Sequence, residues 1–186
     1  SLRLCDIFFD FRTAWGSPAF GNDLRGHITQ LAANNHSLLH QLQELSQDQG
    51  VGLSMFKRFI VEKEDPDHKG EINLKQSGTL PLVEGIRLLS LREKITETST
   101  LARLDTLHEQ EIIDDNDHDY LHGAFRIICK LLLRQQIRDF KAGAKVSNYI
   151  HPRNLSKRDT HLLKNSMEAI HRLRERIRSE FTADIF

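Results

Sequence analysis

The chain has 186 residues, of which 39% are hydrophobic and 28% charged, and this composition is typical of a globular protein rather than a disordered one. The 26 basic and 26 acidic residues cancel, which argues against a dedicated nucleic-acid binder. No apolar run approaches the roughly 18 residues of a membrane span. The two cysteines form no disulfide framework, so we expect a cytoplasmic protein. From the charge balance and the short apolar runs we expect neither a nucleic-acid nor a membrane partner.

The first twelve residues differ in pattern from the rest of the chain. The run from Leu4 to Arg12 is rich in β-branched and aromatic residues, which favours a β-strand. A lone strand cannot satisfy its backbone groups, so we expect this one to complete a sheet of a further domain. The expected organisation is therefore a strand remnant and linker over residues 1–16 and a helical domain over residues 17–186.

From Ser17 onward the apolar residues recur with helical spacing. Ser17 followed by Pro18 is a typical helix start, and that helix is expected to reach about Gln49. A short extended piece is expected over residues 71–75. Further helices are expected over 53–62, 80–94, 98–110, 117–142 and from Ser156 to about 181. The sequence thus predicts a mainly α protein, an antiparallel bundle of about six helices with a short N-terminal strand.

Charge is segregated along the second half of the chain. Seven acidic residues and no lysine or arginine lie between Asp105 and Asp119, whereas eight basic residues against three acidic ones lie between Arg153 and Arg178. One interpretation is a pair of solvated helix faces. The other is a basic surface for a phosphate-bearing ligand or an acidic partner.

Motifs of independent enzymes are missing from the sequence. It contains no GxSxG, no P-loop, no GxGxxG and no HExxH, and no nucleophile has an obvious base beside it. His118 and His122 lie four apart and could share one face of a helix, but no third metal ligand is evident. We therefore predict no catalytic residue and no metal site in this chain.

Two charged residues in the expected strand are candidates for a site. Asp10 and Arg12 lie two apart, so a strand would place both side chains on one face. Such a pair is an ordinary salt bridge in one interpretation. In the other, it lies beside a phosphate and metal site.

Further polar residues in the helical part are candidates for binding a substrate. Arginine suits bidentate phosphate recognition and lysine acts as a point charge, while glutamine can hydrogen-bond a ligand inside a cavity. Each could equally be a solvated residue or a helix cap. The candidates are Lys75, Arg87, Arg103, Arg134 and Gln136.

Several segments together carry a family resemblance. They are IFFDFR at residues 7–12, WGSPAF at 15–20, GTLPLVEGIRLL at 78–89, TLARL at 100–104 and LRQQ at 133–136. The chain resembles the C-terminal substrate-binding domain of bacterial nucleotidyltransferases that carry cyclic-nucleotide-binding and CBS domains. These proteins are in turn similar to the protein-PII uridylyltransferases.

The resemblance implies that this chain is the helical half of a signal-transducing nucleotidyltransferase. An upstream catalytic domain of the same polypeptide would use Mg²⁺ and an NTP to transfer a nucleotidyl group to a small or protein acceptor. The helical part would not be catalytic alone and would need no cofactor of its own. Asp10, Arg12, Lys75, Arg87, Arg103, Arg134 and Gln136 are then the expected substrate-binding residues.

A non-enzymatic function remains as the alternative. The helices could form a module that dimerises or relays a regulatory signal. Polar residues around an inward pocket would favour substrate binding, whereas a large exposed apolar helix face would favour the interaction module.

Overall fold

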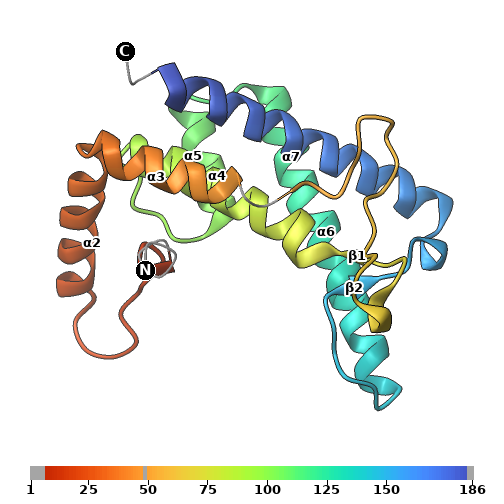
Figure 1. Cartoon of the computed structure of the whole chain (residues 1–186). Coiled ribbons are helices and arrows are strands. Elements are labelled where there is room, and N and C mark those ends of the chain that lie inside the picture. Colours follow the sequence, from red (N-terminus) through yellow and green to blue (C-terminus); the bar gives the residue numbers. More distant parts are fainter. Residues whose placement is uncertain (1–6, 48–49, 184–186) are drawn as a thin grey trace. The chain divides into compact units, whose positions relative to one another are not determined.

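The computed structural model describes residues 7–47 and 50–183, and these are mainly α-helical, as predicted (Figure 1). A short antiparallel pair of strands, β1 (Ile72–Asn73) and β2 (Tyr149–Ile150), joins Ile72 to Ile150 and Asn73 to Tyr149. The six helices of the described residues are α2 (Pro18–Ala33), α3 (His36–Gln47), α4 (Leu80–Arg92), α5 (Thr100–Glu109), α6 (Asp115–Lys141) and α7 (Lys157–Ala183).

The N-terminal segment corrects the expectation of a strand. Ile7 and Phe8 are helical, and the next two residues form a turn in which Asp10 N–H donates to the Ile7 carbonyl at 3.1 Å. Phe11 N–H likewise donates to the Phe8 carbonyl at 3.2 Å. These local bonds satisfy the backbone where no neighbouring strand is paired with this segment among the described residues. Residues 4–6 of the expected strand lie outside the described ranges.

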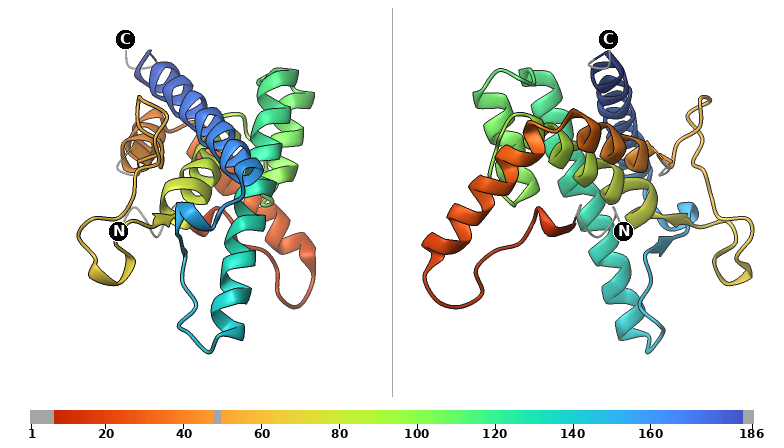
Figure 2. Two further views of the ribbon diagram at one scale, coloured as in Figure 1. Left: turned by 90° about the vertical axis from the view of Figure 1, so that its right-hand side faces the viewer. Right: turned by 60° about the vertical axis from the view of Figure 1, so that its left-hand side comes forward.

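The single helix expected over residues 17–49 is two helices in the structure. Ser17 caps α2 as predicted, with its hydroxyl accepting from Ala19 N–H at 3.4 Å. Asn34 ends α2, and the side chain of Asn35 accepts from Leu38 N–H at 3.0 Å, which starts α3. Asparagine competes for backbone hydrogen bonds, so this Asn-Asn pair explains the bend between α2 and α3 (Figure 2).

The helix expected over residues 53–62 is absent from the structure. Leu53 instead forms an isolated antiparallel bridge with Phe59, and the chain turns between them. Lys57 takes a positive φ of 54° in this turn, a conformation incompatible with a continuous helix. The apolar residues of this segment matched a helical period by chance. A run of only ten residues is too short for that period to distinguish a helix from a turn.

The remaining helices confirm the sequence expectations to within a few residues. Pro81 lies in the first turn of α4, directly after a π-helical segment, Lys75–Thr79. Ser156 precedes α7, and its hydroxyl accepts from Asp159 N–H at 3.0 Å, as the expected capping pattern requires. The described part of the chain contains no helix that is both long and apolar enough to cross a membrane.

Contacts divide the chain into two units. The described part of the first unit comprises residues 7–47, 83–118 and 175–183, and the second comprises residues 50–82 and 119–174. Leu89, Leu104 and Leu107 are fully buried residues of the first unit. Ile72, Ile128, Ile150, Leu163 and Met167 are their counterparts in the second. Each unit thus has its own buried apolar residues, contributed by segments distant in sequence.

Candidate functional site

Asp10 is the centre of a charged cluster in the first unit. One oxygen of its carboxylate, Oδ2, lies 2.5 Å from Nη2 of Arg87 on α4. The other, Oδ1, lies 2.7 Å from Nη2 of Arg103 on α5. The same nitrogen of Arg103 also donates to the Phe9 carbonyl at 3.4 Å. Three of the predicted site residues, distant in sequence, therefore meet at one carboxylate.

Both arginines lie on buried helix faces. Arg103 is on the same face of α5 as Leu107, four residues later, and only 2% of its surface is exposed. Arg87 lies between the buried Ile86 and Leu88 and is 7% exposed. A buried guanidinium is costly unless an anion and hydrogen bonds compensate for the lost water. The carboxylate of Asp10, whose side chain is 30% exposed, provides an anion for both.

A third buried arginine contacts the same segment and was not among the predicted residues. Arg25 on α2 donates from Nη2 to the Phe11 carbonyl, and its guanidinium carbon lies 4.7 Å from the centre of the Phe11 ring. We call Arg25, Arg87 and Arg103 the arginine seat of residues 9–11. Nothing in the spacing of Arg25 distinguishes it from a solvated helix residue, because its contact is made across 14 residues.

The other predicted residues make contacts with residues outside this cluster or are exposed. Arg12 is exposed in the first unit, and Lys75 is exposed in the second. Arg134 forms an ion pair with Asp159 at 2.9 Å, and Gln136 donates to the side chain of Asn148 at 3.3 Å. These two polar residues of α6 therefore hold neighbouring segments of the second unit.

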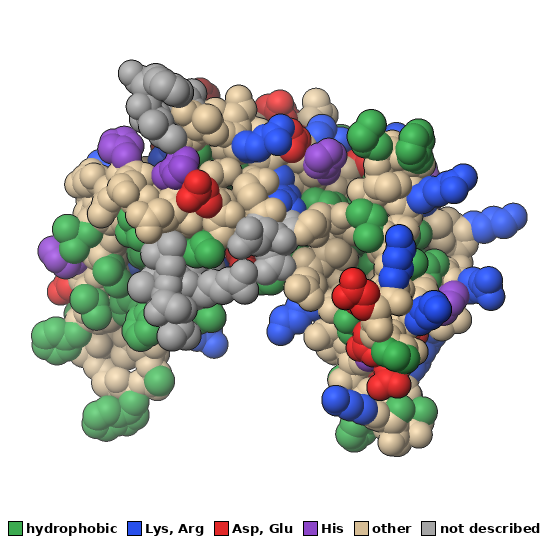
Figure 3. Space-filling model, in the orientation of Figure 1, with side chains coloured by type: hydrophobic (Ala, Val, Ile, Leu, Met, Phe, Trp, Pro, Cys, Tyr) green, Lys and Arg blue, Asp and Glu red, His purple; other side chains and the backbone are tan. Residues whose placement is uncertain are grey.

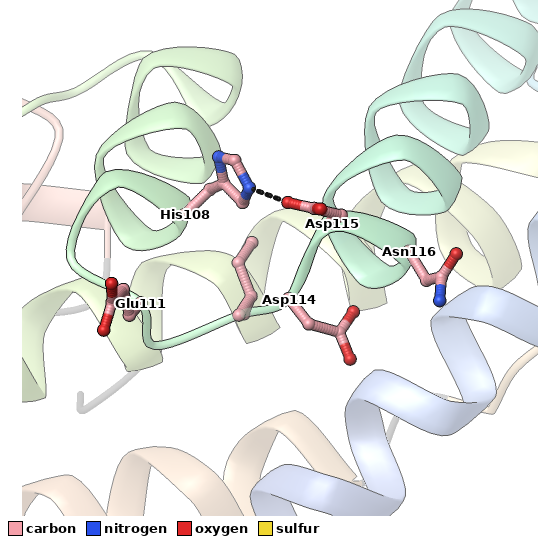
Figure 4. Close-up of a pocket in the computed structure, with 6 residues that line it drawn as sticks. His108, Glu111, Asp114, Asp115 and Asn116 are labelled. Atoms are coloured by element: carbon pink, nitrogen blue, oxygen red, sulfur yellow. Dashed lines mark hydrogen bonds and ion pairs between the residues drawn. The ribbon is translucent and has the colours of Figure 1, made fainter.

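A second polar group in the first unit surrounds a hollow of about 400 Å³ (Figure 4). His108 lies at its edge, and Nε2 of its ring is 2.7 Å from Oδ1 of Asp115. The ring of His118 stacks on that of His108 with centres 4.6 Å apart, and its Nε2 lies 2.9 Å from Oδ1 of Asp105. The lining residues are His108, Glu111, Ile113, Asp114, Asp115 and Asn116.

These contacts bear on the metal pair considered from the sequence. His118 faces a carboxylate and another histidine, and the described residues include no group of three or more His, Cys, Asp or Glu side chains arranged to hold a metal ion.

A third polar feature is a hollow of about 490 Å³ in the second unit, lined in part by Glu62, Asn73 and Ser77. Glu62 Oε1 accepts from the backbone N–H groups of Lys63 and Glu64 at 2.8 and 2.9 Å and of Asp65 at 3.3 Å. Hydrogen bonds from the backbone N–H groups of Glu64, Asp65 and Lys63 lower the pKa of Glu62. The charged carboxylate therefore accepts the hydrogen bonds of these three donors in the turn.

Comparison with known protein families identifies a family for this chain. A family model described as "Putative nucleotidyltransferase substrate binding domain" matches residues 36–181, which include α3 to α6, α7 up to residue 181, and both Arg87 and Arg103. No curated protein matches the chain. No solved structure matches it either.

Proposed function

Because the chain belongs to this family of nucleotidyltransferase substrate-binding domains, we propose that its arginine seat binds an anionic group of the substrate. The observation that carries the proposal is the convergence of two buried guanidiniums, from α4 and α5, on the single carboxylate of Asp10. Arginine presents a planar fork of donors that matches carboxylate and phosphate oxygens. Asp10 thereby takes the position that a substrate carboxylate or phosphate would occupy.

The chemistry of the seat supports positioning rather than catalysis. Arginine stays protonated at all working pH values and so cannot serve as a general base. It can orient an acceptor or hold the phosphates of an NTP while another domain carries out the transfer. An incoming anion would compete with Asp10 for the same nitrogens, so the Asp10 segment would set the affinity of the site.

The wider setting is part of the same proposal. We place the chain in a nucleotidyltransferase similar to the protein-PII uridylyltransferases, acting in cytoplasmic signal transduction with CBS and cyclic-nucleotide-binding domains. Its upstream catalytic domain would bind Mg²⁺ and the NTP, and its acceptor would be a protein or a small molecule. The family match supports substrate binding in general, and the resemblance of the segments at residues 7–20 and 78–104 supports this particular setting.

The test is calorimetric titration of ATP, UTP, GTP and CTP into the chain, each with and without Mg²⁺. We expect at least one nucleotide to bind with a dissociation constant near or below the millimolar range. Arg103→Lys keeps the charge but loses the fork, and should weaken binding by roughly tenfold. Asp10→Asn removes the competing charge and should tighten binding.

Arg12→Ala is the matched control, because Arg12 is an exposed arginine two residues from Asp10. It should leave the dissociation constant unchanged, and circular dichroism should show that all three variants keep their helices. If neither the unmodified chain nor Asp10→Asn binds any of the nucleotides, and acetate and phosphate also fail to bind, the seat is a structural contact and the proposal is wrong.

A further inference from the structure

Helix α2 has an inverted distribution of side chains. Its buried residues are Arg25, Thr29 and Ala32, whereas large apolar side chains lie on the opposite side. Phe20 is 81% exposed, and Leu24 and Leu31 are 55% and 57% exposed. Figure 3 shows hydrophobic side chains along its left-hand edge, over α2. With the exposed His27, these residues define what we call the outer stripe: Phe20, Leu24, His27 and Leu31.

The arginine seat explains this orientation. Arg25 turns inward to the Phe11 carbonyl and ring, and at 100° per residue the opposite face of the helix then carries the outer stripe. An amphipathic helix normally buries its apolar stripe. An exposed one, continuous over three turns, is typical of an interaction surface.

We propose that the outer stripe pairs with the same stripe of a second copy of this chain, in antiparallel orientation. The spacing of the four residues is four, three and four, which is the a/d spacing of a two-helix seam. It reads the same from either end, as a two-fold symmetric interface requires. Antiparallel pairing sets Phe20 opposite Leu31 of the second copy, and Leu24 opposite His27.

Charge on the helix is compatible with this arrangement. No residue of the outer stripe is Asp, Glu, Lys or Arg, and Asp23 flanks it on one side. In the antiparallel register Asp23 lies opposite Ile28 of the second copy, so the two Asp23 carboxylates do not meet. A parallel pair would instead place the two Asp23 side chains at the same level, where like charges repel.

The area available indicates a weak dimer. One Phe20 side chain can remove roughly 150–250 Å² from water, and two leucines on each copy extend the seam. The total falls at the low end of interfaces, below about 1,200 Å², where complexes are transient. We therefore expect a weak, concentration-dependent dimer, which would bring two arginine seats into one particle.

Sedimentation equilibrium of the whole chain tests the proposal. The unmodified protein should show a concentration-dependent rise from monomer to dimer mass. Phe20→Glu and Leu31→Lys should each weaken the dimer at least tenfold. The double variant F20E/L31K should recover much of the loss, because antiparallel pairing places each new glutamate opposite a new lysine.

Phe140→Glu is the control, since Phe140 is similarly exposed, at 78%, but lies on α6 in the other unit. It should leave the dimer intact, and all variants should keep the circular dichroism of the unmodified chain because the altered positions are exposed. A monomer at every concentration, a dimer insensitive to Phe20→Glu, or a double variant no better than the single ones would each overturn the proposed pairing.

Discussion

Asp10 is the residue on which the candidate site depends. Its carboxylate contacts two guanidiniums that are almost entirely buried, so its removal leaves positive charge without that anion. Breaking a buried ion pair by deleting one partner is far more costly than losing an exposed pair. The partial exposure of Asp10 moderates this cost, because water can reach the space that the carboxylate leaves.

We predict that Asp10→Ala lowers the free energy of unfolding by about 2–4 kcal/mol. The measurement is urea denaturation followed by circular dichroism. Phosphate should raise the midpoint of the variant more than that of the unmodified chain at equal ionic strength, because the ion can fill the seat. Arg12→Ala should change the free energy by less than about 0.5 kcal/mol, and an Asp10→Ala variant as stable as Arg12→Ala would contradict the prediction.

Glu180 on α7 is a second residue with a testable role. Its carboxylate lies 2.5 Å from Nε of Arg176 and 2.7 Å from Nη1 of Arg92. Burial by itself raises the pKa of Glu180, but the hydrogen bonds from Arg176 and Arg92 outweigh burial and hold the pKa below its ordinary value. The folded state therefore favours the charged form.

A lowered pKa in the folded state gives a defined pH dependence of stability. The contribution of Glu180 to the free energy of unfolding is fully present above the pKa that it has in the unfolded chain. This contribution is lost as the pH falls through the pKa that Glu180 has in the folded chain. We predict that Glu180→Gln is less stable than the unmodified chain at neutral pH and that the difference shrinks as the pH falls below about 4. Urea titrations across this range measure it, and a constant difference would exclude the role of these ion pairs.

Among the helices, α7 has the clearest local start signal. The hydroxyl of Ser156 accepts from Asp159 N–H, one of the N–H groups that has no partner within the helix. Asp159 also lies in the first turn, where a negative charge favours the helix dipole. Both effects are local, which is why the sequence predicted this start correctly.

We predict that Ser156→Ala lowers the free energy of unfolding by about 1 kcal/mol, while Ser156→Gly costs only a few tenths. Thermal and urea unfolding of both variants measure the difference. An alanine variant as stable as the glycine variant would show that the cap contributes nothing to α7.

Element boundaries that the sequence predicted wrongly share a physical cause. Around Asn34 and Lys57 apolar residues continue a helical period. The side chain of Asn35, which accepts from Leu38 N–H, and the turn between Leu53 and Phe59 interrupt the helix. Periodicity reports which residues can share a face. It does not show where a polar side chain hydrogen-bonds to the backbone and so competes with the hydrogen bonds of the helix.

On the scale of the whole molecule, α6 and α7 each contribute residues to both units. Residues 115–118 of α6 and 175–183 of α7 belong to the first unit, and the rest of each helix belongs to the second. Each of the two segregated stretches of the sequence contains charged residues that pair with a nearby partner. His118 pairs with Asp105, and Arg176 with Glu180. This favours solvated, internally paired helix faces over a continuous basic surface.

The sequence by itself determined the mainly α architecture, the four helices from Leu80 onward and the capping residues Ser17 and Ser156. These follow from the spacing of apolar residues and from contacts over two to four positions, which a local pattern records. It also identified Asp10, Arg87 and Arg103 as candidates, from their chemistry and from resemblance. It did not show that they meet.

Only the tertiary structure decided that Asp10 contacts Arg87 across 77 residues, that Arg25 turns inward and that the apolar side of α2 turns outward. Such contacts depend on how separate helices pack, and the same helical period is compatible with either face being buried. A buried arginine and a solvated one look alike in sequence, because burial depends on which other residues the fold brings next to each of them.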